Sequence, residues 1–197
     1  MRYIVLTGGI ASGKSSVSNM LLENGISVVD ADKIAHEVLD EKADEITNAF
    51  GREFVKEGRV DRKKLGELIF KDKSQREILE SILHENIYQK IKTAAASLEK
   101  QKKLFVVDIP LFFEKEGIYK SALTAVVYAP KQMQIARLMQ RSKLTEDEAR
   151  LRVAAQLDIE QKRAKADVVI DNSKDLAHLK KEVEKFIAIL KERHVSQ

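Results

Sequence analysis

The chain has 197 residues, a length that suits one α/β domain with insertions and that can bury a core without disulfides. It has no cysteine, so disulfides and thiol catalysis are excluded, and this composition fits a reducing, cytoplasmic location. Its 35 basic and 31 acidic residues give a net charge of +4, with both signs interspersed along the chain. Short basic clusters beside acidic residues are typical of solvated helix faces, so we expect no nucleic-acid partner.

The first predicted element is a strand over residues 3–7, which are mostly apolar and β-branched. This stretch is too short to be a signal peptide, and it already serves as a strand. No apolar run along the chain approaches the ~18 residues of a membrane span, so we expect no membrane partner.

A phosphate-binding loop follows this strand. The segment matches the motif G-x-x-x-x-G-K-[ST] in full, as Gly8-Gly9-Ile10-Ala11-Ser12-Gly13-Lys14-Ser15. Residues 15–22 then have the apolar spacing of a helix, so the loop leads from a strand into a helix start. Backbone N–H groups and the helix dipole favour an anion at such a point. A Gly/Ser turn without a ligand is disfavoured by this context, and we predict that the chain binds a nucleoside triphosphate.

Individual residues of the loop have predicted roles. Lys14 would reach the β- and γ-phosphates, and the hydroxyl of Ser15 would hold Mg²⁺. The residues expected to contact the nucleotide are Gly9, Ile10, Ala11, Ser12, Gly13, Lys14, Ser15 and Ser16.

An inserted helical domain is predicted after the second strand. That strand is expected at residues 27–30, and a helix at residues 31–39. Residues 41–100 contain no convincing strand, and their apolar positions recur at helical spacing. This region is too long for a plain crossover between strands. We therefore predict a helical substrate-binding insertion at about residues 31–100 within one domain, residues 1–197.

The remaining elements alternate between strands and helices. The predicted strands are residues 104–108, 123–128 and 167–170, and the predicted helices are residues 131–141, 145–156 and 176–190. With the first two strands this gives an α/β fold with a five-stranded parallel sheet flanked by helices. Ligands bind such sheets at the carboxyl ends of their strands.

Three aspartates follow the ends of predicted strands. Asp30 and Asp32 lie just past the second strand, where a kinase needs a carboxylate that accepts the proton of the attacking hydroxyl. We favour Asp32 as this base and Asp30 as the cap of the following helix. Asp108 ends the third strand, and either a Mg²⁺ site or a strand-end hydrogen bond explains it.

Arginines gather in the two helices that are predicted between the last two strands. Arg137 and Arg141 lie four residues apart on one helix face. Guanidinium groups stabilise the charge of a migrating phosphoryl group, so we predict an arginine-rich lid at about residues 134–160. Arg141 is the catalytic candidate, and Arg137 the nucleotide-binding one. Alternatively these arginines are surface groups that pair with nearby acidic residues 146–148.

Taken together, these segments resemble the dephospho-coenzyme A kinase family along nearly the whole chain. The resemblance covers the loop from Thr7, the segment D-A-D-x-I-A at 30–35, G-x-[LI]-[DN]-R-x-x-L at 58–65, P-L-L-[FY]-E at 110–114, the lid, and A-D-x-[VI]-[IL]-x-N at 166–172. Two departures are modest: Glu85 follows His84 where the family commonly has proline, and Ser142 follows Arg141 where it often has aspartate or asparagine.

The resemblance implies a P-loop fold and the transfer of the ATP γ-phosphate to the ribose 3′-hydroxyl of dephospho-coenzyme A. It implies that Asn172 contacts the nucleotide. The acceptor-binding residues that it implies are Thr7, Asp32, Arg62, His84, Pro110 and Leu111. Another small-molecule or nucleoside monophosphate kinase of the same fold is the alternative, and a non-catalytic ATP-binding regulator is a further one. We expect a monomer.

Overall fold

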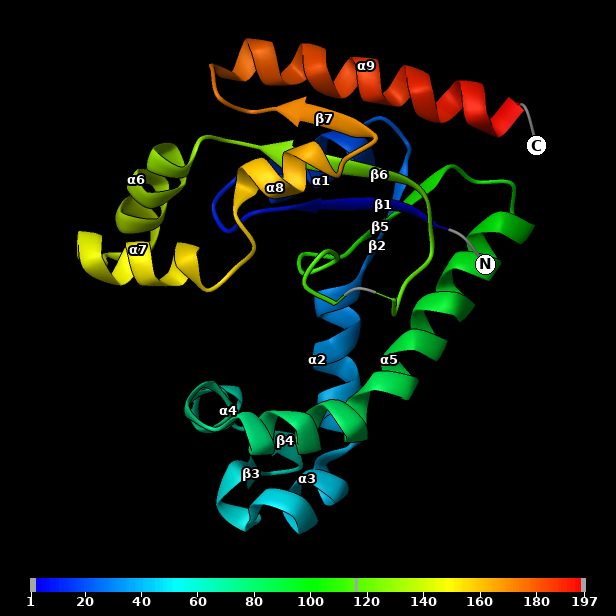
Figure 1. Cartoon of the computed structure of the whole chain (residues 1–197). Coiled ribbons are helices and arrows are strands. Elements are labelled where there is room, and N and C mark those ends of the chain that lie inside the picture. The colour runs from blue at the N-terminus through cyan, green and yellow to red at the C-terminus, as the bar shows by residue number, and fades with distance from the viewer. Residues whose placement is uncertain (1–2, 116, 196–197) are drawn as a thin grey trace. The chain divides into compact units, whose positions relative to one another are not determined.

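The computed structural model describes residues 3–115 and 117–195. The chain divides into two compact units (Figure 1). The first unit consists of Met1–Asp30 and Ala95–Gln197, and the second of Ala31–Ala94.

The first unit is built on a parallel sheet. Its strands are β1 (Tyr3–Gly8), β2 (Ser27–Asp30), β5 (Phe105–Asp108), β6 (Ser121–Tyr128) and β7 (Val168–Asp171). They pair in the order β2-β5-β1-β6-β7, and every pair is parallel. The predicted five-stranded parallel sheet is therefore confirmed. The central position of β1 places the loop that follows it at the middle of the sheet's carboxyl edge.

Helices α1 (Lys14–Glu23) and α9 (Leu176–Val195) contribute to the core of this unit. Val17 of α1 and Phe186 of α9 are fully buried in one apolar cluster with Leu6 of β1. Burial of one such side chain stabilises the fold by about 2 kcal/mol. In Figure 1, α9 lies over β7, the last strand of the sheet. The packed helices thus fix β1 and the start of α1, between which the glycine-rich loop lies.

Three short helices lie between β6 and β7. Helices α6 (Lys131–Ser142) and α7 (Glu146–Ala154) lie side by side (Figure 1) and share a small apolar cluster. The expected helix at residues 145–156 is in fact shorter, since Thr145 caps its start through a capping box and the helix ends at Ala154. Helix α8 (Ile159–Ala164) was not expected. Six residues are too few for a periodic apolar pattern, although Asp158 caps the helix.

The second unit has its own apolar core. It contains α2 (Ala31–Glu41), α3 (Ala43–Phe50), the short 3₁₀ helix Arg52–Phe54 and α4 (Arg62–Lys71). Helix α5 (Lys73–Lys100) begins in this unit and ends in the first. Apolar side chains from all these elements form one cluster, which includes Val38, Ile46, Phe54, Leu65 and Leu83. The second unit therefore has the core that an independent packing unit needs.

The expectation that residues 41–100 hold no strand is wrong. Strands β3 (Val55–Lys56) and β4 (Arg59–Val60) form an antiparallel hairpin. The two residues of its turn, Glu57 and Gly58, both have positive φ angles, 50° and 74°. This is the backbone of a two-residue type I′ turn, which fits the twist of a hairpin. Each strand has only two residues, so neither could show the alternating pattern by which strands are recognised.

Candidate active site

The backbone of the loop after β1 requires glycine at defined positions. Gly13 has a φ of +95°, and a side chain there would collide with the amide of Asn172. A Cβ atom on Gly8 would lie 2.9 Å from the carbonyl oxygen of Val127. Only glycine fits the first position without strain and the second without a clash. The two glycines of the motif are therefore required by the backbone conformation of the loop and by the atoms packed around it.

The N-terminus of α1 is open toward a ligand. Gly13 is its N-cap residue, and within the described part of the chain no side chain caps this helix. Its first turn carries no acidic residue, and both Ser15 and Ser16 are exposed. The first N–H groups of a helix lack intrahelical partners and carry a partial positive charge. An anion such as a phosphate group satisfies both conditions.

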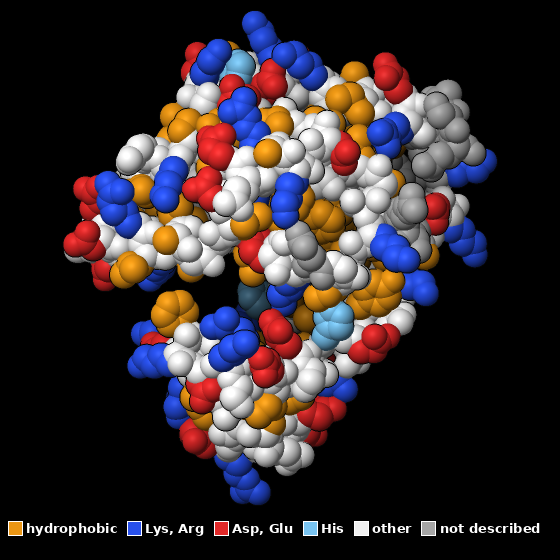
Figure 2. Space-filling view, viewed as in Figure 1, with side chains coloured by type: hydrophobic (Ala, Val, Ile, Leu, Met, Phe, Trp, Pro, Cys, Tyr) orange, Lys and Arg blue, Asp and Glu red, His pale blue; other side chains and the backbone are white. Residues whose placement is uncertain are grey.

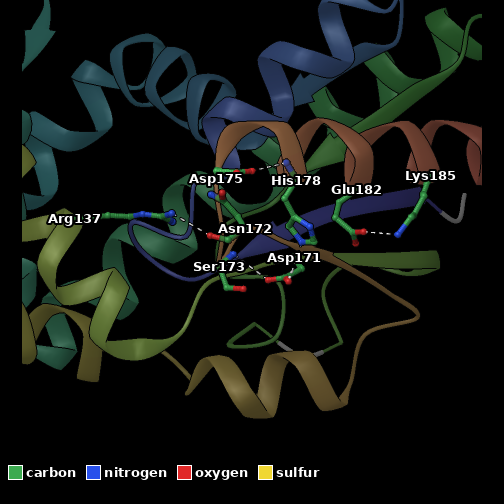
Figure 3. A network of polar contacts seen from close by, with 8 residues as sticks. All are labelled: Arg137, Asp171, Asn172, Ser173, Asp175, His178, Glu182 and Lys185. Atoms are coloured by element: carbon green, nitrogen blue, oxygen red, sulfur yellow. Dashed lines mark hydrogen bonds and ion pairs between the residues drawn. The ribbon is translucent and has the colours of Figure 1, made fainter.

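Side chains from two distant segments hold the loop. The Asn172 amide donates to the carbonyl oxygen of Ser12 at 2.8 Å. Arg137 reaches the same oxygen at 3.4 Å and the carbonyl oxygen of Asn172 at 3.0 Å; Figure 3 shows its guanidinium directed at Asn172. On the other side, the N–H of Ile10 donates to Gln156 Oε1 at 2.7 Å. The structure thus brings Arg137 and Asn172, both predicted nucleotide-site residues, to the loop.

Lys14 is paired with Asp108. Its Nζ atom lies 2.5 and 2.7 Å from Oδ1 and Oδ2 of Asp108, and Oδ2 also accepts from the Ser18 hydroxyl at 3.2 Å. Only 4% of Asp108 is exposed. Burial raises the pKa of Asp108 above its usual value, Lys14 and Ser18 oppose this shift, and Asp30 adds to it. The carboxylate charge at the end of β5 therefore depends on the loop lysine.

The turn after β7, which carries Asn172, is held by a network of polar contacts (Figure 3). Asp171 accepts from the N–H of Ser173 at 2.9 Å and lies 3.0 Å from His178 Nε2. Asp175 caps α9 by accepting from the N–H of His178 at 2.8 Å. Burial alone would raise the pKa of Asp171, but the hydrogen bonds from Ser173 and His178 lower it below its usual value. This network fixes the backbone on which Asn172 reaches the loop.

Three of the predicted acceptor residues lie in the first unit. Thr7 is buried, and its hydroxyl donates to the carbonyl oxygen of Pro110 at 3.1 Å. Leu111 follows and is partly exposed. Because β1 and β5 are neighbours in the sheet, these residues come together at its carboxyl edge.

The remaining predicted acceptor residues, together with the predicted base, belong to the second unit. Asp32 is exposed in the first turn of α2. Arg62 begins α4 and forms an ion pair with Asp40 at 2.7 Å. His84 is half-buried in α5. Thus Arg62 has a structural partner within its own unit, which its sequence pattern did not reveal.

The lid arginines differ in their surroundings. Arg137 is half-buried against the loop, whereas Arg141, one turn further along α6, is exposed. Arg150 of α7 pairs with Glu146, as the alternative of surface ion pairs expects. The arginines of α6 and α7 therefore differ in role: Arg137 contacts the loop, whereas Arg150 forms a surface ion pair.

Several residues at the loop had no predicted role. Gln156 accepts from Ile10, and the amide of Gln134 lies against Gly9 and donates to the carbonyl oxygen of Ala129. Lys162 is fully buried and donates to the carbonyl oxygen of Gly8. Gln156 belongs to the stretch R-V-x-x-Q at 152–156 by which the lid resembles the family, whereas Gln134 and Lys162 stand in no pattern that separates them from surface residues. Their contacts emerge only from the fold.

Three wider features concern the surface charge, groups of possible metal ligands and the apolar character of the helices. On the face drawn in Figure 2, Lys and Arg side chains are interspersed with Asp and Glu side chains. Among the described residues there is no cluster of three or more His, Asp or Glu side chains that could hold a metal ion. Within the same described residues, no helix has the length and apolar character to span a membrane.

A parallel sheet whose central strand leads through a G-x-x-x-x-G-K-S loop into an uncapped helix defines a nucleotide-binding protein of the P-loop class. The model of one family, described as dephospho-CoA kinase, matches residues 2–178. A dephospho-CoA kinase of Helicobacter pylori is 43% identical over 189 residues, which are 95% of this chain and 96% of the relative. The chain belongs to the dephospho-CoA kinase family, and it is a kinase.

Solved structures agree with this assignment. A dephospho-CoA kinase from Campylobacter jejuni has a TM-score of 0.73 and 38% identity, over 96% of this chain and 98% of its own. A structure from Thermus thermophilus has a TM-score of 0.82 and 34% identity, over 96% and 99% of the two chains. The P-loop fold therefore extends along nearly the whole chain.

Proposed function

We propose that this protein transfers the γ-phosphate of ATP to the ribose 3′-hydroxyl of dephospho-coenzyme A, which yields coenzyme A and ADP. The observation that carries the proposal is the open phosphate loop, with Lys14 held at its end, in a chain of the dephospho-CoA kinase family. This transfer is the last step of coenzyme A synthesis.

The loop has the features that ATP requires. The α1 N-terminus offers N–H groups without helical partners. Lys14 supplies a positive charge, and a phosphate can take the place of Asp108 as the anionic partner of its ammonium group. The buried hydroxyl of Ser12 has no hydrogen-bond partner among the described residues. An unsatisfied buried donor is costly, which favours a ligand that accepts from it. Residues 9–16, Arg137 and Asn172 would bind the nucleotide.

We place Mg²⁺ at the exposed hydroxyl of Ser15. Mg²⁺ keeps water and phosphate ligands and needs few protein groups, so the site does not require a cluster of carboxylates. When bound, the ion neutralises charge on the phosphate oxygens. Asp108 is the second candidate ligand, but its carboxylate already accepts from Lys14. Its first role is therefore to hold this lysine at the end of the loop.

For the acceptor, we assign Asp32 as the carboxylate that orients the 3′-hydroxyl and takes its proton. The transition state of phosphoryl transfer is loose, so this group acts mainly by positioning. Arg141, exposed on α6, would stabilise the charge of the migrating phosphoryl group. The acceptor itself would be held by Thr7, Arg62, His84, Pro110 and Leu111.

The decisive experiment measures ADP release with dephospho-coenzyme A, AMP, CMP, dTMP, shikimate and pantothenate as acceptors. We expect fast release with dephospho-coenzyme A alone. Preference for a nucleoside monophosphate would replace the proposal by another kinase of the same fold. Tight ATP binding without turnover on any acceptor would favour a regulator. Size-exclusion chromatography tests our further expectation that the cytoplasmic enzyme is a monomer.

A further inference from the structure

A second lysine, Lys162, contacts the phosphate loop and is fully buried. Lys162 of α8 has no exposed surface, and its Nζ atom donates to the carbonyl oxygen of Gly8 at 3.2 Å. The same ammonium group lies 2.6 Å from Glu114 Oε1. Lysine is almost never fully buried unless it is paired. The function proposed above does not use this ion pair.

Glu114 connects two further segments at this point. Its Oε1 atom also accepts from the N–H of Leu157 at 3.0 Å. Glu114 lies in the segment after β5, and Leu157 lies between α7 and α8, directly after the predicted lid helices. Neighbouring Gln156 accepts from the N–H of Ile10. The segment that ends the predicted lid is therefore bonded to the loop directly and, through Glu114 and Lys162, at its first glycine.

A fully buried ammonium group is an expensive way to stabilise a fold, because it loses its hydration and its partner Glu114 is itself only partly shielded, with 19% of its side chain exposed. Its position therefore calls for another explanation. Gly8 ends β1 and begins the phosphate loop, and the backbone there is closely surrounded, since a Cβ atom would lie 2.9 Å from Val127 O. An ammonium group that donates to the Gly8 carbonyl oxygen fixes the orientation of the first peptide of the loop.

We propose that Lys162 and Glu114 are positioning residues, which hold the start of the phosphate loop and the end of the lid in the arrangement that binds nucleotide. The kinetic part of this inference rests on the proposed function, but its nucleotide-binding part does not. The competing explanation is a purely structural ion pair, which affects affinity only by destabilising the fold. The two explanations differ in what happens when the pair is replaced as a whole.

The experiment compares Lys162→Met with the double variant Lys162→Met/Glu114→Leu. The single variant leaves the partly exposed Glu114 carboxylate without its ion-pair partner and should lower the Tm, whereas the double variant removes both charges and should recover it. ADP affinity is measured by calorimetry well below each Tm. We expect both variants to bind ADP at least about tenfold more weakly, the equivalent of one lost hydrogen bond to a charged group. Lys180→Met, an exposed lysine of α9, is the matched control.

A double variant that regains ADP affinity together with its Tm would overturn the proposal, since the pair would then be structural only. If the double variant fails to fold, Glu114→Gln decides, because it keeps the shape of the side chain but removes its charge. Unchanged ADP affinity in that variant would also refute the proposal. Turnover adds a second readout, in which we expect KM for ATP to rise and kcat to fall. A wild type that binds ADP but does not phosphorylate dephospho-coenzyme A would refute the function and leave the binding test intact.

Discussion

The two units of the molecule use charge differently. In the first unit, Asp108 and Lys162 are buried beside the phosphate loop, 4% and 0% exposed. In the second unit, the ion pairs Arg62–Asp40 and Lys90–Glu41 are more exposed, with side-chain exposures between 27% and 57%. Buried ion pairs lose much hydration energy, whereas exposed pairs contribute little in either direction. The buried charges of the first unit therefore lie where nucleotide binding needs them, and substitutions of these residues should alter activity and stability together.

Lys14→Met should have the largest effect. It removes the ammonium that neutralises the transferring phosphoryl group, so we expect kcat to fall roughly 10²–10³-fold. It also leaves Asp108 buried without its ion-pair partner, which should destabilise the fold by up to about 3 kcal/mol. The measurements are a coupled ADP assay and thermal unfolding. Lys14→Arg is the control, because it keeps the charge for Asp108 but changes the shape that faces the phosphates.

The same variant makes a prediction about pH. Lys14 lowers the pKa of Asp108, so its removal should raise that pKa further. A carboxyl whose pKa is raised in the folded state favours folding when protonated, and this stability is lost as the pH rises through the folded pKa. The Tm deficit of Lys14→Met should therefore shrink toward acidic pH. A deficit that grows on acidification would contradict the assigned role of the pair.

The contrast between the units also explains what could be predicted from the sequence. The loop was predictable because Gly13 must adopt a positive φ and Lys14 must follow it, constraints that leave a readable motif. The strands of the sheet were predictable because they are buried apolar runs. The β3–β4 hairpin was not, since its strands have two residues each and their pairing depends on the turn at Glu57 and Gly58.

Contacts over long sequence distances were unpredictable for another reason. Asp108 was recognised as a strand-end carboxylate, but its pairing with Lys14 joins residues 94 positions apart. Lys162 looks like a surface lysine within a charged stretch, and only the packing of α8 makes it a buried one. The charged groups at the loop thus gain their roles from the fold, while the motif identifies only the loop itself.

Asp32→Asn tests an exposed charge of the second unit, the carboxylate that we assign to accept the proton of the acceptor hydroxyl. Asparagine keeps the size of the side chain but cannot take the proton, so kcat should fall roughly 10²-fold. Because Asp32 is exposed, we expect the Tm of the variant to remain near that of the wild type. Asp30→Asn is the matched control and should be milder. Normal turnover in Asp32→Asn would assign the base elsewhere.

Within helix α6, Arg137 is half-buried against the loop and Arg141 is exposed, so substitutions of the two compare a partly buried charge with an exposed one. Arg137 holds the Ser12 and Asn172 carbonyl oxygens, so Arg137→Ala should weaken ADP binding about tenfold, a loss of about 1.4 kcal/mol. Arg141 is exposed, and Arg141→Ala should lower kcat about tenfold with ADP affinity unchanged. Calorimetry and steady-state kinetics separate the two. If both variants lose affinity equally, the division between a loop-holding arginine and a catalytic one is wrong.

The smallest effect is expected at Asp40, a partly exposed carboxylate of the second unit to which we assign no contact with substrate. Burial alone would raise the pKa of Asp40, but hydrogen bonds from the Val60 N–H and Arg62 lower it below the usual 3.8. A lowered carboxyl pKa contributes stability above the unfolded value, and this stability is lost as the pH falls through the folded pKa. Asp40→Asn should thus lower stability by at most about 1 kcal/mol at pH 7.

This stability deficit should disappear once the pH falls below the pKa of Asp40 in the folded wild type, which lies under the usual 3.8, because Asp40 is then protonated in the wild type as well. Glu67→Gln, an exposed position of α4, is the control and should show no deficit at either pH. Thermal unfolding at pH 7 and below pH 3.8 measures the difference, and turnover at pH 7 should stay within about twofold of the wild type, since Asp40 itself is assigned no contact with substrate. A large loss of activity without a loss of stability would instead mean that Asp40 acts through Arg62 on the acceptor.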